Sequence, residues 1–514
     1  MKGSKAVVEC LLEQGVDTIF GYPGGMILPL YDALYDEKRI HHILTTHEQN
    51  AAHAADGYAR ASGKVGVCIA TSGPGATNLV TGIATAFMDS IPLVAITGQV
   101  DIELLGRDAF QEMDILDVTM PVTKHNYKVK DVRRLVPILR DAFHLAKSGR
   151  PGPVLVDIPR NLFFEEVDYA PLSKTKKEPG KPDADFLICA AEAAEVIRRA
   201  KQPVIIAGGG VISAGASGEL RSFAEKYHLP VANTLMGIGA FPQGHPQALG
   251  FAGMHGRKTT NNAIAAADLI IAIGSRFGDR QTGNLAKYTV DTKFIHIDID
   301  PAEIDKNIAS SIGLAGNMKI ILKLLMQRDA VNTLASWWEK IHEWQEKYAY
   351  DYHVNRLTVP WAMHHMAVHT AKKPFAFATD VGQHQMWAAL HLKVEEPRTW
   401  ITSGGLGTMG FGLPAAMGAQ LYFGDTRRVI HIAGDGGIKM TGNEYYTISR
   451  LRLPIISIIV NNTSLGMIRQ LQRVMYKGRY MSCELTQEMN FVGYAESFGI
   501  EAEAVSTPEE FAEA

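Results

Sequence analysis

Two apolar runs in the last third of the chain end in residues that could hold a metal ion and a phosphate. Residues 429–433 lead into Gly434-Asp435-Gly436-Gly437, and residues 455–460 lead into Asn461-Asn462. Such runs, with a helical segment between them, are typical of buried parallel strands, which place ligands at the carboxyl edge of a sheet. The Asp435 carboxylate and the Asn462 carbonyl suit Mg²⁺ or Ca²⁺, and the glycines let the backbone approach a phosphate. The sequence therefore predicts a metal and phosphate site, against the alternative of two turns without a ligand.

Strand and helix patterns alternate along the whole chain, which predicts an α/β fold of three doubly wound parallel-sheet domains. The chain of 514 residues is too long for one core. A Pro-, Gly- and Lys-rich stretch reads as a linker, and a segment with Trp337, Trp338 and Trp344 reads as a connecting helix. We expect an N-terminal domain at 1–165, the linker at 166–188, a central domain at 189–330, the connecting helix at 331–358 and a last domain at 359–514.

The composition excludes several classes of protein. A net charge of -3 gives no electrostatic reason to expect nucleic acid or an anionic membrane as partner. No apolar run approaches the ~20 residues of a membrane span. The 4 cysteines are scattered without a CxxC pair, which argues against a disulfide framework or zinc site and fits a reducing cytosol. We expect a cytoplasmic protein.

The GDG and NN elements, with the spacer between them, resemble the thiamine-diphosphate binding motif. The resemblance implies Mg²⁺ held by Asp435, by the Asn462 side chain and by the Ser464 backbone carbonyl. A second stretch, HEQNAAHAADGYARASG, is similar to the segment of thiamine enzymes that carries their indispensable glutamate. Glu48 is then expected to hydrogen-bond the aminopyrimidine and to promote the imino form that takes the proton from C2. From the helix start alone, Glu48 could equally serve the helix dipole.

The first domain closely resembles the acetohydroxyacid synthase family. The stretches FGYPGGMILPLYDALYD, TSGPGATNLVTGIATAFMDSIPLVAITGQV, DAFQEMDI and PVTKHNY carry this resemblance. It implies active-site roles for Gly25, Phe110, Gln111 and Lys124, with Gln111 as a hydrogen-bond donor and Lys124 attracting an anionic 2-ketoacid. Within the basic run KHNYKVK, Lys124 could equally be a solvated surface lysine.

The resemblance also implies a reaction and partners. Pyruvate is decarboxylated on thiamine diphosphate, and its hydroxyethyl unit is joined to a second 2-ketoacid, pyruvate or 2-ketobutyrate, in branched-chain amino acid biosynthesis. A homodimer at least is expected, with Glu48 from one chain and Asp435 from the other in each site, together with a regulatory small subunit. The rival readings are a catabolic acetolactate synthase, a pyruvate oxidase or another carboligase, or a catalytically silent homologue.

In the last domain the resemblance assigns most of the cofactor contacts. Gln383 and His384 are expected to reach the diphosphate, and Met409 to bend the cofactor so that its two rings meet. The implied cofactor set is Val381, Gly382, Gln383, His384, Gly407, Met409, Gly434, Asp435, Gly436, Gly437 and Asn462. Met467 and Leu471 are expected at the substrate, and Leu471 stands where most biosynthetic members carry a Trp that favours 2-ketobutyrate. A helix-start signal at 506–510 lies close to the last residue, Ala514, so we expect the family's C-terminal segment to be missing.

The central domain has strand-end glycines that weakly resemble a dinucleotide-binding half, without a GxGxxG at Gly208. By the family resemblance it binds FAD that takes no part in net redox chemistry. The implied contacts are Gly208, Gly209, Gly210, Thr234, Leu235, Met236, Gly253, Met254, His255, Gly274, Arg276, Arg280 and Asp298. Arg280 is also expected to meet the substrate carboxylate. Gly278 and Asn317 replace two aspartates of the family, so a vestigial nucleotide fold that only spaces the outer domains is the alternative.

Overall fold

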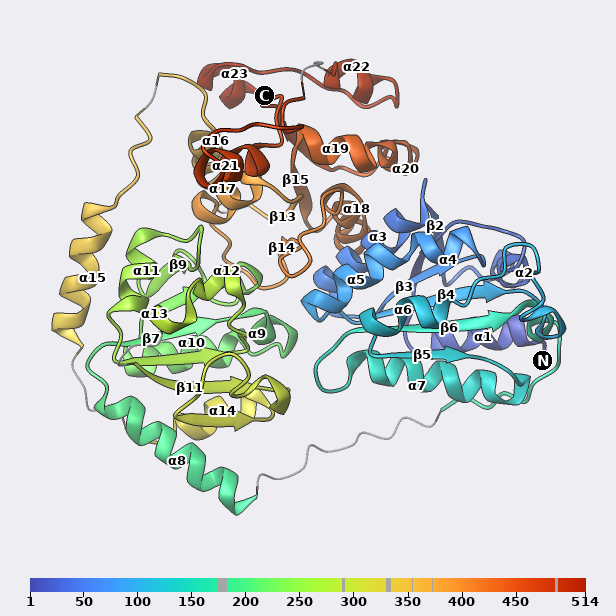
Figure 1. The fold of residues 1–514 in the computed structure, drawn as a ribbon, viewed down its shortest axis with the longest axis horizontal. Coiled ribbons are helices and arrows are strands. Elements are labelled where there is room, and N and C mark those ends of the chain that lie inside the picture. Colours follow the sequence, from blue (N-terminus) through green and yellow to red (C-terminus); the bar gives the residue numbers. More distant parts are fainter. Residues whose placement is uncertain (173–182, 289–291, 330–333, 354, 372, 486–488) are drawn as a thin grey trace. The chain divides into compact units, whose positions relative to one another are not determined.

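The computed structural model describes residues 1–172, 183–288, 292–329, 334–353, 355–371, 373–485 and 489–514 (Figure 1). The chain forms two compact units. The first comprises Met1–Lys176, Pro374–Gln385 and Ile401–Ala504, and the second comprises Lys177–Lys373, Met386–Trp400 and Val505–Ala514. Within the described residues, no helix is both long and apolar enough to cross a lipid bilayer.

The N-terminal sheet belongs to the first unit and is parallel throughout, in the order β2-β1-β3-β4-β6-β5. Its inner strands β3, β4 and β6 consist of buried residues only, as expected of a parallel sheet covered on both faces. Helices α1, α2 and α7 share one core cluster with the sheet, and α3 and α5 share another. The strands are β1 (Thr18–Gly21), β2 (His41–Leu44), β3 (Gly66–Ala70), β4 (Leu93–Gln99), β5 (His125–Lys128) and β6 (Pro153–Pro159). The helices are α1 (Gly3–Glu13), α2 (Leu28–Tyr35), α3 (Glu48–Ser62), α4 (Pro74–Asn78), α5 (Val80–Asp89), α6 (Ile115–Thr119) and α7 (Leu135–Lys147).

The central sheet belongs to the second unit and is also parallel, in the order β12-β11-β10-β7-β8-β9. Its strands are β7 (Pro203–Ala207), β8 (Val231–Asn233), β9 (Ala248–Phe251), β10 (Leu269–Ile273), β11 (Lys293–Asp298) and β12 (Ile312–Ala315). Its helices are α8 (Ala184–Arg199), α9 (Gly209–Ser213), α10 (Ser217–Tyr227), α11 (Lys258–Ala265), α12 (Asp279–Thr282), α13 (Leu285–Tyr288), α14 (Met318–Leu325) and α15 (Ala335–Lys347).

The C-terminal sheet has the order β14-β13-β15-β16. Its strands are β13 (Phe375–Thr379), β14 (Trp400–Ile401), β15 (Arg428–Gly434) and β16 (Ile456–Val460). The helices of this part of the chain are α16 (Val359–Thr370), α17 (Gln383–His391), α18 (Gly412–Phe423), α19 (Asp435–Thr441), α20 (Tyr445–Arg450), α21 (Gly466–Met475), α22 (Phe491–Glu496) and α23 (Pro508–Glu513).

Helix α18 packs against α3, so the N- and C-terminal sheets of the first unit share a helical contact. Glycines make the approach close: a Cβ on Gly57 would lie 2.1 Å from the Ala415 carbonyl oxygen, and one on Gly418 would lie 1.9 Å from that of Ala54. Larger residues at these positions would force the two helices apart.

Each sheet has a point where the strand order reverses: between β1 and β3, between β7 and β10, and between β13 and β15. At such a point the loops that leave the carboxyl ends diverge and open a crevice in which ligands bind. The prediction of three doubly wound parallel-sheet domains is confirmed. The loops at these points are 21–26 with 71–76, 208–210 with 274–276, and 380–384 with 434–437.

The structure differs from the expected organisation of the chain in four respects. Helix α8 begins at Ala184, inside the stretch expected as linker, while the linker's lysine run at 174–177 lies outside the described residues. Helix α15 fills only part of the expected connecting segment, and Trp337 packs in the core with its indole N–H donating to the Pro203 carbonyl at 3.1 Å. Residues 386–400 and 505–514 group with the second unit. Strand β16, expected to be buried, is an edge strand of half-buried and exposed residues.

Candidate functional site

Asp435 lies buried where β15 passes into α19. Asp435 is only 2% exposed, and its Oδ1 accepts a hydrogen bond from the Gly436 amide at 3.1 Å. Its Oδ2 has no hydrogen-bond partner among the described residues. Burial raises the pKa of Asp435, against the opposing effects of the Gly436 amide, Lys439 and the Ser464 amide. A buried carboxylate oxygen of this kind fits a bound cation, which would supply the missing partner.

Asn462 and Ser464 follow β16 and form a tight turn next to Asp435. The Asn462 Oδ1 accepts from the Ser464 amide at 3.1 Å. Ser464 also bridges Glu484 in antiparallel fashion, through hydrogen bonds from the Leu465 amide to the Cys483 carbonyl (2.7 Å) and from the Leu485 amide to the Thr463 carbonyl (2.8 Å). In that pattern the Ser464 N–H and C=O both point away from the Glu484 segment. The Ser464 carbonyl therefore shares a side with the Asn462 oxygen, as two ligands of one ion require.

His384 occupies the loop after β13 and is buried with its Nε2 unpartnered among the described residues. Burial lowers the pKa of His384 to about 4, so the ring is neutral near pH 7. A Cβ on Gly434 would come within 3.0 Å of this ring and one on Gly382 within 2.8 Å. Glycine at both positions thus makes room for the imidazole, which also hydrogen-bonds the Asp380 backbone. Gln383, beside it, donates through Nε2 to the Gln470 Oε1 on α21 at 2.7 Å.

The loop with Gly407 and Met409 closes over the same edge. Gly407 adopts a positive φ of +71° and lies beside Val381, and the Met409 Cε is 3.4 Å from where a Cβ of Gly436 would stand. The Gly410 amide donates to both Asp380 oxygens at 3.0 Å. The residues that sequence motifs assign to the diphosphate half thus gather at the switch point between β13 and β15. Met467 and Leu471 lie on α21, which follows the Asn462–Ser464 turn in the sequence.

Glu48 is the first residue of α3 and follows β2. Its Oε2 accepts from the Asn78 Nδ2 at 2.9 Å, and its Oε1 would lie 3.3 Å from a Cβ of Gly75. Gly25 has open space on its Cα, and Gln111 packs against Gly73, where a Cβ would lie 2.8 Å from the Gln111 carbonyl oxygen. Next to Gln111, Phe110 is 81% exposed. The carboxyl edge of the N-terminal sheet thus holds the Glu48 carboxylate in a fixed orientation, with open space at Gly25. Asn78, missed at the sequence level, is the residue that orients Glu48.

Lys124 does not join this group. It immediately precedes β5 and so lies at the amino edge of the sheet, opposite Glu48. Its Nζ donates to the carbonyls of Leu145 and of Ser148 (the latter at 2.7 Å), at the C-terminal end of α7. A lysine in this position stabilises a helix C-terminus. A basic residue that does lie at the carboxyl edge is Arg160, which is exposed directly after the buried strand β6.

The expected FAD contacts lie at the carboxyl edge of the central sheet, in the segments after β7, β8, β9 and β10 and, for Asp298, at the last residue of β11. At the switch point the two glycine loops touch: a Cβ on Gly208 would lie 2.0 Å from the Gly274 carbonyl oxygen. Asp298 is buried, and burial raises its pKa. Arg280 is exposed, with Nη1 3.7 Å from the Met254 sulfur. Asn317 caps α14 by accepting from two backbone amides, a role that Asn and Asp fill equally well.

The three sheets and their loops define a class of protein. Models of the thiamine pyrophosphate (thiamine diphosphate) enzyme family match the N-terminal TPP binding domain at residues 1–118, the central domain at 190–325 and the C-terminal TPP binding domain at 380–514. The chain is therefore a thiamine pyrophosphate enzyme.

Full-length relatives narrow this class. The acetolactate synthase large subunit of Parasynechococcus marenigrum is 46% identical over 99% of this chain and 84% of its own length. The probable acetolactate synthase large subunit of Methanocaldococcus jannaschii is 46% identical over 100% of this chain and 89% of its own. Isozyme 3 of the Escherichia coli large subunit is 42% identical over 99% and 91%. The chain belongs to the acetolactate synthase large-subunit family.

A buried carboxyl group at the carboxyl edge of the N-terminal sheet predicts how the stability of the protein depends on pH. Asp157, buried near the end of β6, accepts from the Thr97 hydroxyl at 2.7 Å and from the Gln99 amide at 3.1 Å. Burial raises its pKa to about 7, against those hydrogen bonds. Because the folded pKa exceeds the unfolded one, folding favours the protonated form. Its stabilising contribution is complete at acidic pH and is lost as pH rises through about 7.

We expect Asp157→Asn to flatten the decline of stability between pH 5 and 8. The wild-type decline due to this group is at most about 1.4 kcal/mol per pH unit. Thermal midpoints measured across this range test the effect, with Asp141→Asn, an exposed carboxylate on α7, as control. Identical pH profiles for Asp157→Asn and wild type would contradict the assignment.

Proposed function

We propose that this chain forms acetolactate from two molecules of pyruvate, with thiamine diphosphate and Mg²⁺ as cofactors. The observation that carries the proposal is the buried Oδ2 of Asp435 beside the Asn462–Ser464 turn, which has no hydrogen-bond partner in the part of the chain that the structure describes. That donor set of carboxylate, amide and carbonyl oxygens fits Mg²⁺, which would offset the negative charge of a diphosphate. Family membership supports the same reaction, since the relatives' names are those of acetolactate synthases.

When bound, the cofactor would supply the carbon nucleophile that adds to the ketoacid before carbon dioxide is lost. The protein would position both molecules and supply protons. Asp435, Asn462 and Ser464 would hold the metal, and Gln383 would donate to the diphosphate, with His384 beside it. In the other half-site, Glu48, oriented by Asn78, would hydrogen-bond the pyrimidine ring.

We propose further that each site is shared by two chains. Helix α21 contributes no buried residue, and apolar side chains stand exposed near both half-sites. Exposed apolar surface of this extent is typical of an interface. These residues are Phe110, Met113, Val118 and Met120 in the N-terminal part and Ile468, Leu471, Val474, Met475 and Met481 in the C-terminal part. A small regulatory subunit is proposed as a further partner, because the relatives are named large subunits.

Complementation tests the shared site. Mixing Glu48→Gln chains with Asp435→Asn chains, each inactive alone, should restore roughly one quarter of wild-type activity, because half of the dimers are mixed and each has one intact site. Sites confined to single chains would stay inactive in the mixture.

FAD is proposed as a structural cofactor of the central sheet. The Gly208 and Gly274 loops meet at the switch point, where exposed backbone could contact a dinucleotide. Arg280, exposed and 3.7 Å from the Asp279 carboxylate through its Nε, could also meet an anion. Flavin absorbance in the purified protein, released on denaturation, tests this assignment. Protein that remains colourless after incubation with FAD would favour the vestigial nucleotide fold.

Leu471 gives a specificity prediction. Its side chain is 40% exposed on α21, and a larger aromatic ring there would contact the extra methyl group of 2-ketobutyrate. Leu471→Trp should therefore raise the preference for 2-ketobutyrate over pyruvate as acceptor by about tenfold, the worth of one buried methyl group. The measurement is the product ratio when both acceptors compete. Val474→Trp, on the next turn, serves as control, and an unchanged ratio in Leu471→Trp would remove Leu471 from the acceptor site.

A further inference from the structure

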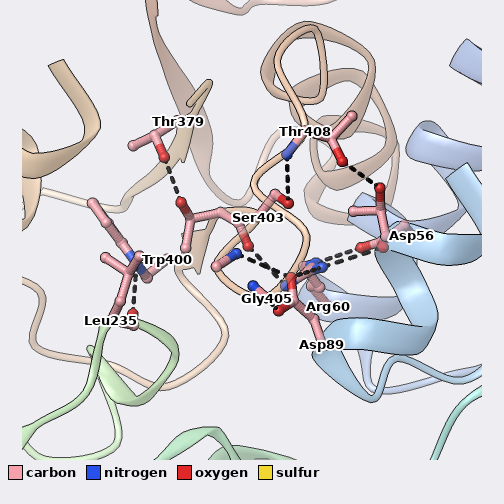
Figure 2. A network of polar contacts seen from close by, with 12 residues as sticks. Asp56, Arg60, Asp89, Leu235, Thr379, Trp400, Ser403, Gly405 and Thr408 are labelled. Carbon is pink, nitrogen blue, oxygen red and sulfur yellow. Dashed lines mark hydrogen bonds and ion pairs between the residues drawn. The ribbon is translucent and has the colours of Figure 1, made fainter. Parts of the chain in front are cut away.

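A buried ion cluster lies between α3, α5 and the loop that carries Gly407 and Met409 (Figure 2). Arg60, in the last turn of α3, pairs with both Asp56 oxygens and donates to the Asp89 Oδ2 at 2.9 Å. Its Nη1 donates to the Thr402 carbonyl at 2.9 Å, and the guanidinium lies 5.1 Å from the Phe411 ring centre. One buried cation thus joins two helices of the N-terminal part to the start of the loop.

Asp89, the last residue of α5, holds the loop itself. Its Oδ1 accepts from the Gly405 amide at 2.7 Å, and its Oδ2 accepts from the Gly404 amide at 3.2 Å as well as from Arg60. Figure 2 shows Gly405 turned toward this carboxylate. Two successive backbone amides on one carboxylate fix both the position and the orientation of the peptide.

Further bonds fix the stem of the loop on either side. The Thr408 hydroxyl meets that of Thr85 on α5 at 2.7 Å, and its amide donates to the Ser403 hydroxyl at 3.2 Å. The Thr402 hydroxyl meets that of Thr379, at the end of β13, at 2.6 Å. Between Thr402 and Thr408, residues 405–407 are exposed. The loop is therefore held at both ends and accessible to solvent between them.

We propose that Asp89 is a positioning residue for cofactor binding: with Arg60 it holds residues 402–409 so that Gly407 and Met409 meet the pyrimidine end of thiamine diphosphate. The inference rests on the proposed function. It also links the loop to α3, whose first residue is Glu48. In the proposed shared arrangement, Glu48 and Met409 of one chain serve different sites.

Asp89→Asn tests this inference because it keeps the shape and removes an acceptor. An amide has one oxygen where the carboxylate has two, so its NH₂ would face either the Gly405 amide or Arg60, donor against donor. We expect thiamine diphosphate to bind roughly tenfold more weakly, the cost of one charge-assisted hydrogen bond. The dissociation constant is measured by calorimetry at saturating Mg²⁺. Amide hydrogen exchange over 402–410 in cofactor-free protein should become faster.

Two further variants keep the test decisive. Asp56→Asn removes the other carboxylate beside Arg60, and Asp56 makes no hydrogen bond to the loop residues that the structure describes. Because it acts on the loop only through Arg60, it should weaken cofactor binding and speed the loop exchange less than Asp89→Asn does, although loss of a buried ion pair should lower the thermal midpoint. Thr85→Val removes the hydroxyl that meets Thr408 without touching a charge, and it should show a smaller effect in the direction of Asp89→Asn.

The outcomes separate the two proposals. Faster loop exchange and weaker binding in Asp89→Asn and Thr85→Val, with a smaller change in Asp56→Asn than in Asp89→Asn, support a positioning role. Equal effects of Asp56→Asn and Asp89→Asn, or wild-type loop exchange in Asp89→Asn, overturn it. If wild type itself bound no thiamine diphosphate, the proposed function would fail, whereas the exchange of the cofactor-free loop would still decide whether Asp89 holds it.

Discussion

Glu48→Gln should lower the rate of acetolactate formation by about 10²–10⁴-fold, the usual worth of a proton-transferring group. Glutamine keeps the length of the side chain and can still meet Asn78, but it cannot hold the proton that the pyrimidine ring shares with a carboxylate. Binding of thiamine diphosphate should change only a few-fold, since the metal half-site is untouched. Initial rates with pyruvate and calorimetric titration of the cofactor measure the two quantities.

The control addresses the helix-dipole reading of Glu48. Glu219 lies in the first turn of α10, so Glu219→Gln removes a carboxylate from an equivalent helix position. It should leave the rate unchanged. If Glu48→Gln retained more than a tenth of wild-type activity, Glu48 would be a helix-stabilising residue and the catalytic assignment would be wrong.

Asp435→Asn should weaken Mg²⁺-dependent binding of thiamine diphosphate by at least about 100-fold. Loss of residues that merely support metal ligands costs about 10–100-fold, and here a ligand charge is removed. Without metal the same change should leave the protein as stable as wild type or more so, because burial already disfavours the charge of Asp435. The pair of measurements is calorimetric binding and the thermal midpoint with and without Mg²⁺.

Asp425→Asn is the matched control, since Asp425 is exposed just before the opposite end of β15. It should alter neither binding nor the midpoint. If Asp435→Asn bound the cofactor like wild type, or destabilised the metal-free protein, Asp435 would be a structural residue of the turn.

The strands and their glycine loops could be predicted because local sequence determines both. The run 429–433 lies inside β15, and the Gly-Asp-Gly-Gly motif after it marks the switch point. There the buried Asp435 Oδ2 has no hydrogen-bond partner among the described residues. Lys124 shows what a motif cannot give. Its neighbours resemble an active-site stretch, but the edge of the sheet that it occupies depends on where β5 begins.

Contacts between distant segments were beyond the reach of sequence reading. Arg60 and Thr402 are far apart in the chain, and nothing near either residue indicates that they meet. Strand β16 was expected to be buried from its apolar composition, yet it forms a sheet edge. In the proposed dimer the exposed apolar residues of α21 are covered by a second chain, which composition alone cannot distinguish from a core.

The product formed from pyruvate tests the central claim most directly. Purified protein with pyruvate, thiamine diphosphate and Mg²⁺ should release carbon dioxide and acetolactate in equal amounts, with acetolactate measured as acetoin after acid decarboxylation. Omission of either cofactor should abolish the product. Acetate and peroxide in place of acetolactate would instead identify an oxidase and contradict the account.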